Sequence, residues 1–353
     1  MSPRATGGSA RPKPLLEVED LKVEFATDEG VVHAVDGVTF SMHDGEVLSI
    51  VGESGSGKSV TAMTILGLTQ GANARISGSV RYHGTELTTA GAEELQAIRG
   101  DRIAMVFQDP MSSFNPVQRI GDQIVEAIQA HLEISDDDAH RKAVESLASV
   151  GIPDAETRAR HYPFEFSGGM RQRAMIAMAL ALDPAILIAD EPSTALDVTI
   201  QAQILELLKQ LNEDHGLSVI LITHDLGVVA EIADRVLVMY AGQVVEQGTL
   251  DEIFYDPQHP YTWGLLGSLT RLDQDRPDRL PQIGGAPPSL IAPPGGCRFR
   301  PRCPHAFEKC SELPALEERL PMATGHRDRC WLEPSQKKEL REIEGRIALE
   351  VPA

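Results

Sequence analysis

The segment Gly52-Glu53-Ser54-Gly55-Ser56-Gly57-Lys58-Ser59 decides the fold of this chain. It matches the pattern G-x-x-x-x-G-K-[ST], whose glycines let backbone N–H groups surround a phosphate at the N-terminus of a helix. An apolar stretch, 47–51, precedes the segment, and a stretch typical of a helix, 58–68, follows it. This context favours a phosphate site over an ordinary Gly/Ser-rich turn. We therefore predict an α/β nucleotide-binding domain in which Lys58 reaches the β- and γ-phosphates and Ser59 binds Mg²⁺.

A second apolar stretch, 186–189, ends in two carboxylates, Asp190 and Glu191. Burying carboxylates at the end of an apolar strand is costly unless they have a function. In a chain that also carries the phosphate-binding segment, we expect Asp190 to hold Mg²⁺ through water and Glu191 to polarise the attacking water molecule. A pair of solvated acids at a strand end is the alternative.

Composition restricts the class of protein. The chain has 353 residues and a formal net charge of −20. Because nucleic acid and anionic lipid attract basic surfaces, this charge argues against a nucleic-acid groove and against direct docking on a membrane. No apolar run reaches the roughly 18 residues that span a bilayer, and 1–14 lacks the apolar segment of a secretory signal. We expect a cytoplasmic protein with a disordered tail over 1–14, which reaches the membrane only through partner chains.

The apolar pattern predicts further elements along the chain. Two alternating stretches, 15–25 and 31–40, indicate antiparallel strands joined by a turn. Further strands are expected at 102–107 and 218–223 with a hairpin at 236–246, and helices at 118–150, 171–182 and 199–215. The acidic run 136–138 is expected in a solvated bend. After about residue 272, prolines and glycines predict a linker and a small unit with little regular structure, and 336–350 a helical surface tail.

The motifs, taken in chain order, resemble a known family. Gln108 follows one predicted strand, His224 follows another, and Phe166-Ser167-Gly168-Gly169-Met170-Arg171-Gln172 begins a predicted helix. With the phosphate-binding segment and the two acids, they make the stretch 15–261 similar to the nucleotide-binding subunits of ABC transporters. The resemblance implies an ABC-type P-loop ATPase domain over 15–265, with a RecA-like core, an antiparallel β subdomain and a helical subdomain.

The resemblance also implies a role for each motif. Gln108 is similar to the Q-loop glutamine, which touches Mg²⁺ and faces the membrane subunits, and His224 to the switch histidine on the γ-phosphate. The signature residues Ser167, Gly168, Gly169 and Met170 would cap the γ-phosphate that the opposite subunit holds, in a dimer that closes head to tail on two ATP molecules. The run 193–197 resembles the D-loop.

Adenine stacking is assigned to an aromatic side chain. We expect Phe25 to stack on adenine, with His33 as a less favoured substitute. The alternative for Phe25 is that it is simply a core aromatic side chain of its strand.

Further stretches narrow the resemblance to the D-type ATPase subunit of oligopeptide and dipeptide permeases. They are 109–116, the signature FSGGMRQR, 256–262 and the proline-rich 287–297, and the similarity extends over 15–331. It implies uptake of oligopeptides or dipeptides, with an F-type second ATPase, two transmembrane permease subunits and an extracytoplasmic peptide-binding protein as partners. Nickel, glutathione and cationic-peptide importers belong to the same group and remain alternatives, as does an ABC ATPase without a transporter.

All the cysteines of the chain lie near its C-terminus, with the spacing Cys-x5-Cys-x6-Cys-x19-Cys: Cys297, Cys303, Cys310 and Cys330. In a cytoplasmic chain, clustered cysteines favour metal ligation over disulfides. The spacing lacks the C-x2-C pairs of common zinc ribbons, yet four thiolates suit either tetrahedral zinc or an iron–sulfur cluster. Because the family that the chain resembles has members with a [4Fe–4S] cluster at such cysteines, we expect one in an extension over 266–353. Zinc and non-liganding thiols are the alternatives.

Overall fold

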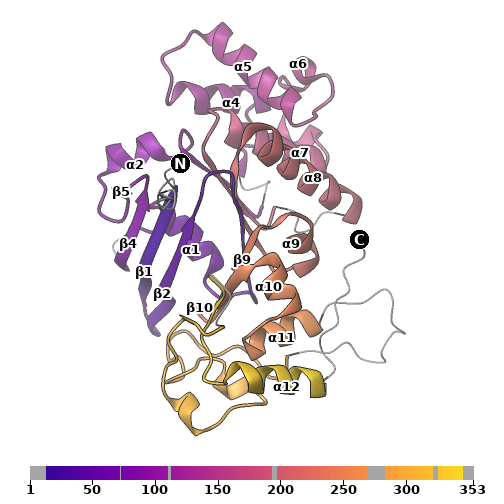
Figure 1. Cartoon of the computed structure of the whole chain (residues 1–353). Helices are drawn as coiled ribbons and strands as arrows, with labels where there is room; N and C mark the ends of the chain where they lie inside the picture. The colour runs from indigo at the N-terminus through magenta and orange to yellow at the C-terminus, as the bar shows by residue number, and fades with distance from the viewer. Residues whose placement is uncertain are drawn as a thin grey trace, which may run out of the picture.

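The computed structural model describes residues 13–71, 73–109, 113–192, 197–268, 283–320 and 325–344. Figure 1 shows an antiparallel sheet on one side, a larger sheet with its helices in the middle, a group of helices (α4, α5 and α6) at the top, and the C-terminal segment below, ending in α12. The phosphate-binding segment belongs to the middle part. No helix among the described residues is both long and apolar enough to cross a membrane.

The antiparallel sheet has the strand order β2-β1-β4-β5. Its strands are β1 (Leu16–Thr27), β2 (Gly30–Met42), β4 (Ala74–Tyr82) and β5 (Thr85–Glu86). The predicted pairing of the first two strands is confirmed, with Thr27 opposite Gly30 across the turn. The sequence prediction missed β4 because only Val80 and Tyr82 of this strand are buried, so its apolar alternation is weak.

The larger sheet has the order β11-β12-β10-β9-β3-β8-β7-β6. Its strands are β3 (Val47–Val51), β6 (Ile103–Val106), β7 (Ile186–Asp190), β8 (Ser218–Thr223), β9 (Arg235–Tyr240), β10 (Gln243–Thr249), β11 (Glu317–Glu318) and β12 (Arg327–Asp328). The run from β9 to β6 is parallel. The carboxyl ends of β3, β8, β7 and β6 therefore meet at one edge, where open α/β sheets bind ligands.

Most helices pack against the larger sheet, and one, α12, belongs to the C-terminal segment. They are α1 (Lys58–Ile65), α2 (Ala92–Ile98), α4 (Ile120–Gln129), α5 (Asp136–Ser149), α6 (Ala155–Arg158), α7 (Gly168–Leu180), α8 (Val198–His215), α9 (Leu226–Ile232), α10 (Leu250–Tyr255), α11 (Pro260–Gly267) and α12 (Pro334–Glu344). The predicted bend at 136–138 is wrong, because these acids form the first turn of α5. Ser135 caps that turn by accepting from the backbone N–H of Asp138, and acidic side chains there interact favourably with the helix dipole.

The buried apolar side chains of the described residues form three large clusters and a small one of Trp263, Cys330 and Leu332. One lies between the two sheets around α1 and includes Leu48, Ile50 and Ile65. A second joins the opposite face of the larger sheet to α4, α5, α7 and α8. The third holds α10 and α11 against β9 and β10, and includes Phe299 from the C-terminal segment. The parallel strands of the larger sheet are thus buried on both faces, as is usual for parallel sheets.

The C-terminal segment, 283–344 in the described ranges, attaches to the larger sheet. β12 pairs antiparallel with β10, so that Asp328 lies opposite Glu246. The predicted terminal helix is present as α12, and most of its side chains lie on the surface as predicted, but Lys337 and Arg341 are buried. The Lys337 side chain is 0% exposed and bonds to both carboxylate oxygens of Asp328. This buried pair fixes α12 to the sheet.

Candidate functional site

The loop between β3 and α1 depends on glycine at two close contacts. Gly57 has a φ of +100°, and a Cβ on it would lie 2.4 Å from the carbonyl oxygen of Ala34 in β2. A Cβ on Gly52 would lie 2.1 Å from the carbonyl oxygen of Met239 in β9. Gly55, with a φ of +76°, faces open space instead. The backbones of β2 and β9 therefore set the shape of the loop, and only glycine fits between them.

Lys58 lies inside this loop. Its side chain is buried, and its ammonium donates to the carbonyl oxygens of Gly52, at 2.8 Å, and Glu53, at 3.0 Å. Burial lowers the pKa of Lys58, and the charges of Glu191, Asp190 and Glu53 partly oppose this shift. The Ser56 hydroxyl is also buried and has no hydrogen-bond partner in the described part of the chain. An ammonium and an unpaired hydroxyl in one glycine-rich loop suit the oxygens of a phosphate.

Ser59 and Asp190 meet beside the loop. The Ser59 hydroxyl donates to Asp190 Oδ1 at 3.1 Å. Burial raises the pKa of Asp190, and the hydrogen bond from Ser59 lowers it in part. Hydroxyl and carboxylate oxygens are the protein ligands that Mg²⁺ takes together with phosphate oxygens. The donor set therefore fits the Mg²⁺ site that the sequence predicts here.

Glu191 is held between two other predicted residues. Gln108 Nε2 donates to Glu191 Oε2 at 2.8 Å, and His224 Nδ1 lies 3.3 Å from Glu191 Oε1. Glu191 has a φ of +48°, which is strained for a non-glycine residue and is common at functional sites. These side chains face one open cavity of about 610 Å³, together with Gly52, Glu53, Ser54 and Arg302. The sheet edge thus brings the predicted phosphate, magnesium and water-activating groups to one site.

The signature residues begin α7. Ser167 Oγ accepts from the backbone N–H of Met170 at 3.3 Å, and Ser167 itself is exposed. Gly169 packs against α8, where an added Cβ would lie 2.8 Å from Ile200 Cγ2. None of the four signature residues lines the cavity at the phosphate-binding loop. Of these four residues, Ser167 is exposed, Gly168 and Met170 are half-buried and Gly169 is buried, so the N-terminus of α7 is partly open to the surface.

Phe25 does not line that cavity either. It lies half-buried in β1, opposite Val32 and Ala74, and packs on the core between the sheets. Its strand pairs with β2, whose Ala34 touches the phosphate-binding loop. The D-loop prediction falls on 193–196, which lie outside the described residues, and on Asp197, which caps α8.

Two residues of the site were missed by the sequence analysis. Tyr261, in α11, accepts the backbone N–H of Glu53 at 2.9 Å. Arg302, in the C-terminal segment, binds the Glu53 carboxylate through two nitrogens at 2.6 and 3.0 Å. They lie 208 and 249 residues from Glu53 along the chain. No local motif signals such partners.

All four cysteines line one small, closed apolar cavity, together with Phe299, His305 and Trp331. Burial raises the pKa of Cys303 and of Cys330 to about 12, and backbone hydrogen bonds from His305 and Leu332 partly lower these values. In the described part of the chain, no three His, Cys, Asp or Glu side chains are grouped to hold a metal ion. The thiols thus surround a common space without converging on a single point.

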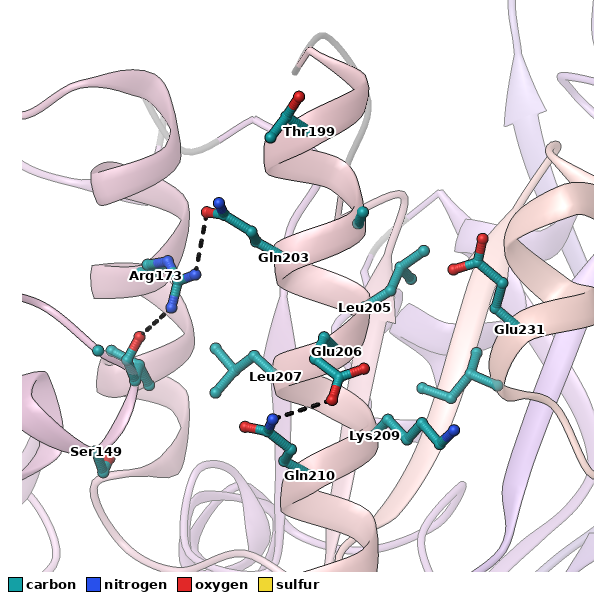
Figure 2. Close-up of a pocket in the computed structure, with 14 residues that line it drawn as sticks. Ser149, Arg173, Thr199, Gln203, Leu205, Glu206, Leu207, Lys209, Gln210 and Glu231 are labelled. Atoms are coloured by element: carbon teal, nitrogen blue, oxygen red, sulfur yellow. Dashed lines mark hydrogen bonds between the residues drawn. The ribbon is translucent and has the colours of Figure 1, made fainter.

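A separate groove, of about 740 Å³, lies between α7, α8 and α9 (Figure 2). Two pairs of its polar side chains are hydrogen-bonded along the helix surfaces. Arg173 bonds to Gln203, and Gln210 bonds to Glu206. None of the predicted site residues lines this groove. We therefore assign the nucleotide chemistry to the sheet edge.

Comparison with known proteins agrees with this geometry. A family model described as "ABC transporter" matches residues 35–194, and one described as "Oligopeptide/dipeptide transporter, C-terminal region" matches 245–310. The chain is 52% identical to the oligopeptide transport ATP-binding protein OppD of Escherichia coli, over 87% of this chain and 90% of that protein. It is 50% identical to the dipeptide transport ATP-binding protein DppD of Bacillus subtilis, over 90% of this chain and 95% of that protein.

Solved structures show the same fold. The dimeric structure of MJ0796, described as a bacterial ABC transporter cassette, superposes with a TM-score of 0.59 at 30% identity, over 67% of this chain and 98% of that chain. A dimeric post-hydrolysis state of the same cassette, bound to ADP and Pi, gives a TM-score of 0.60 at 30% identity and the same coverage.

Proposed function

The chain belongs to the oligopeptide and dipeptide branch of the ABC transporter ATP-binding proteins, and we propose that it hydrolyses ATP to power peptide uptake. The observation that carries this proposal is the meeting of Lys58, Asp190 and Glu191 at one sheet edge, beside Gln108 and His224. The predicted family, cassette fold and ATPase class are confirmed by the comparisons.

The site geometry supports one role for each side chain. Lys58 would exchange its two carbonyl partners for the β- and γ-phosphates, and backbone N–H groups of 52–57 would bind the β-phosphate. Ser59, Asp190 and Gln108 are the residues that would hold Mg²⁺, which neutralises charge on the phosphates when bound. Glu191 would orient and polarise the attacking water, with His224 on the γ-phosphate.

The exposed Ser167 at the start of the signature supports a dimer. Since Ser167, Gly168, Gly169 and Met170 do not line the cavity of their own loop, they would cap the γ-phosphate of a second ATPase subunit. We propose an F-type ATPase as that subunit, two transmembrane permeases that hold the pair at the cytoplasmic face of the membrane, and an extracytoplasmic peptide-binding protein. Phe25 is proposed to stack on adenine, from the sheet that touches the loop.

The cysteine cavity is the basis for a proposed iron–sulfur cluster. In the described residues, no three potential ligands are grouped around a single point, as one zinc ion or any other single metal ion would require. The four cysteines surround a shared apolar space, and Cys297, Cys303 and Cys330 accept backbone N–H groups, as the sulfurs of iron–sulfur clusters do. We propose that Cys297, Cys303, Cys310 and Cys330 hold a [4Fe–4S] cluster, within an extension over 266–353 that follows a cassette over 15–265.

Peptide uptake tests the function. Cells that lack this gene would receive the natural chain, Glu191→Gln, or the surface control Glu206→Gln. We expect the natural chain and Glu206→Gln to restore uptake of labelled di- to hexapeptides. Glu191→Gln should bind ATP yet abolish uptake, because a lost general base costs on the order of 100-fold or more in turnover. If the natural chain leaves peptide uptake unchanged, the cargo is wrong, and nickel and glutathione are tested next.

Metal analysis tests the cluster. Anaerobically purified chain should contain about four iron atoms and as many sulfides per molecule, with broad visible absorbance. Cys303→Ser should lose both, whereas Ser311→Ala should keep them, because Ser311 bonds to Glu308 outside the cavity. One zinc per chain would favour the alternative metal, and metal-free, colourless protein would favour non-liganding thiols.

A further inference from the structure

Each polar group of Glu53 has a hydrogen-bond partner within the protein. Its backbone N–H donates to the Tyr261 hydroxyl at 2.9 Å, and its carbonyl accepts from Lys58 at 3.0 Å. Its carboxylate forms the two-point pair with Arg302. Glu53 is the residue of the phosphate-binding loop that directly follows Gly52, and it lines the cavity that faces the phosphates.

Arg302 is anchored independently of Glu53. Its side chain is 5% exposed, and it donates to the carbonyl oxygens of Ile283 and Gly284 at 3.1 and 2.9 Å. A further bond, at 3.3 Å, joins it to the Tyr240 hydroxyl in β9. The short 3₁₀ turn Arg300–Arg302 carries it, and the backbone N–H of Arg302 donates to Phe299 in the third core cluster. The guanidinium therefore has a fixed position from which it can orient the carboxylate.

We propose that Arg302 is a positioning residue for ATP binding: it neutralises and fixes the Glu53 carboxylate so that the loop accepts polyphosphate. This inference rests on the proposed nucleotide site. Without the guanidinium, a carboxylate that is only 27% exposed would face the phosphate anions without its counter-ion. Like charges repel more strongly in such a partly desolvated place than in water. A two-point Arg–carboxylate pair also fixes direction, which lysine does not reproduce.

A purely structural role predicts different results. If Arg302 only attached the C-terminal segment to the cassette, its loss would lower thermal stability and leave ATP affinity unchanged in folded protein. It would also act independently of the Glu53 charge. A double-mutant cycle between Arg302 and Glu53 separates the two roles, because contacting residues that act together give non-additive effects.

The experiment measures equilibrium MgATP affinity and thermal unfolding of the full chain. The variants are Arg302→Ala, Arg302→Lys, Glu53→Gln and Glu53→Gln/Arg302→Ala. Arg329→Ala is the matched control, because Arg329 is another arginine of the C-terminal segment that donates to backbone carbonyls, those of Val244 and Pro314. It does not line the cavity at the phosphate-binding loop.

We expect Arg302→Ala to weaken MgATP binding about tenfold, and Arg302→Lys about threefold. The double variant should bind within about twofold of Glu53→Gln, because no unpaired carboxylate remains in it. Arg329→Ala should bind like the natural chain. Additive losses, or natural affinity in a folded Arg302→Ala, would overturn the positioning role. If the natural chain itself binds no MgATP, the nucleotide site is wrong, which is a separate failure.

Discussion

The phosphate-binding loop and the C-terminal segment both bury polar groups, but they hold them in different ways. In the loop, Lys58 reaches carbonyls five and six residues away, and the tight fit of glycine to neighbouring strands sets the backbone. In the C-terminal segment, His326 meets Glu246 80 residues away along the chain. The first arrangement is specified by a short motif. The second exists only after the chain has folded around it.

The two regions should therefore respond differently to substitution. The loop should be sensitive to added volume on its backbone, and the C-terminal segment to loss of one partner of a buried pair. The predictions below test this contrast in stability, from the largest effect to the smallest.

Lys337→Met should have the largest effect. It removes the nearer partner of Asp328, whose pKa burial already raises to about 6, and leaves only Arg319, whose Nε lies 3.5 Å from Asp328 Oδ2. Losing one member of a buried ion pair costs about 3 kcal/mol. Urea unfolding of the full chain measures the loss. The double variant Asp328→Asn/Lys337→Met should recover part of it, since position 328 then carries no charge that needs Lys337, and Lys338→Met, on the same helix outside this pair, should change stability little. Equal losses in the single and double variants would contradict the pairing argument.

This contrast explains which parts of the molecule the sequence predicted. β3 has the predicted bounds, and the groups at 52–59, Asp190, Glu191, Gln108 and His224 meet where strand–loop patterns placed them. Each lies at the carboxyl end of a parallel strand, so topology brings them together without any long-range side-chain rule. The position of His224 beside Glu191 follows from the adjacency of β8 and β7.

Most of the features that the sequence did not predict depend on contacts between residues far apart in the chain, which no local pattern encodes. α12 was expected on the surface because its sequence is strongly charged, yet Lys337 is buried through its pairing with Asp328. The run 136–138 was expected in a bend because charge suggests solvent, although Ser135 before three acids is also a helix N-terminal signal. The pairing of Arg302 with Glu53 required the fold itself.

Gly57→Ala should have the next largest effect. The new methyl group would meet the Ala34 carbonyl at 2.4 Å, in a backbone with a φ of +100°. Strain of this kind costs about 2 kcal/mol, and MgATP affinity should fall with it because the loop must shift. Gly55→Ala is the matched control, since its φ is +76° but no atom lies within 4 Å of the added methyl group. Urea unfolding and MgATP titration of both variants measure the difference. Equal costs would mean that backbone strain alone, and not the fit against β2, sets the requirement.

His326→Gln should have the smallest effect, and its size should depend on pH. Burial opposes protonation of His326, but the bond to Glu246, with the charges of Glu252 and Asp256, raises its pKa overall. A raised pKa in the folded state means that the stabilisation is complete below the ordinary value of 6.5 and is lost as pH rises through the folded value. Hydrogen bonds to charged groups contribute about 1.5 to 3 kcal/mol.

We therefore expect the variant to be less stable than the natural chain by about 1.5 kcal/mol near pH 6, with a gap that narrows as pH rises through the raised pKa of His326. Urea unfolding across this range measures the gap. A gap that stays constant with pH would mean that His326 contributes by shape alone. A gap that narrows would mean that the C-terminal segment, unlike the phosphate-binding loop, is attached to the sheet partly by a titrating pair.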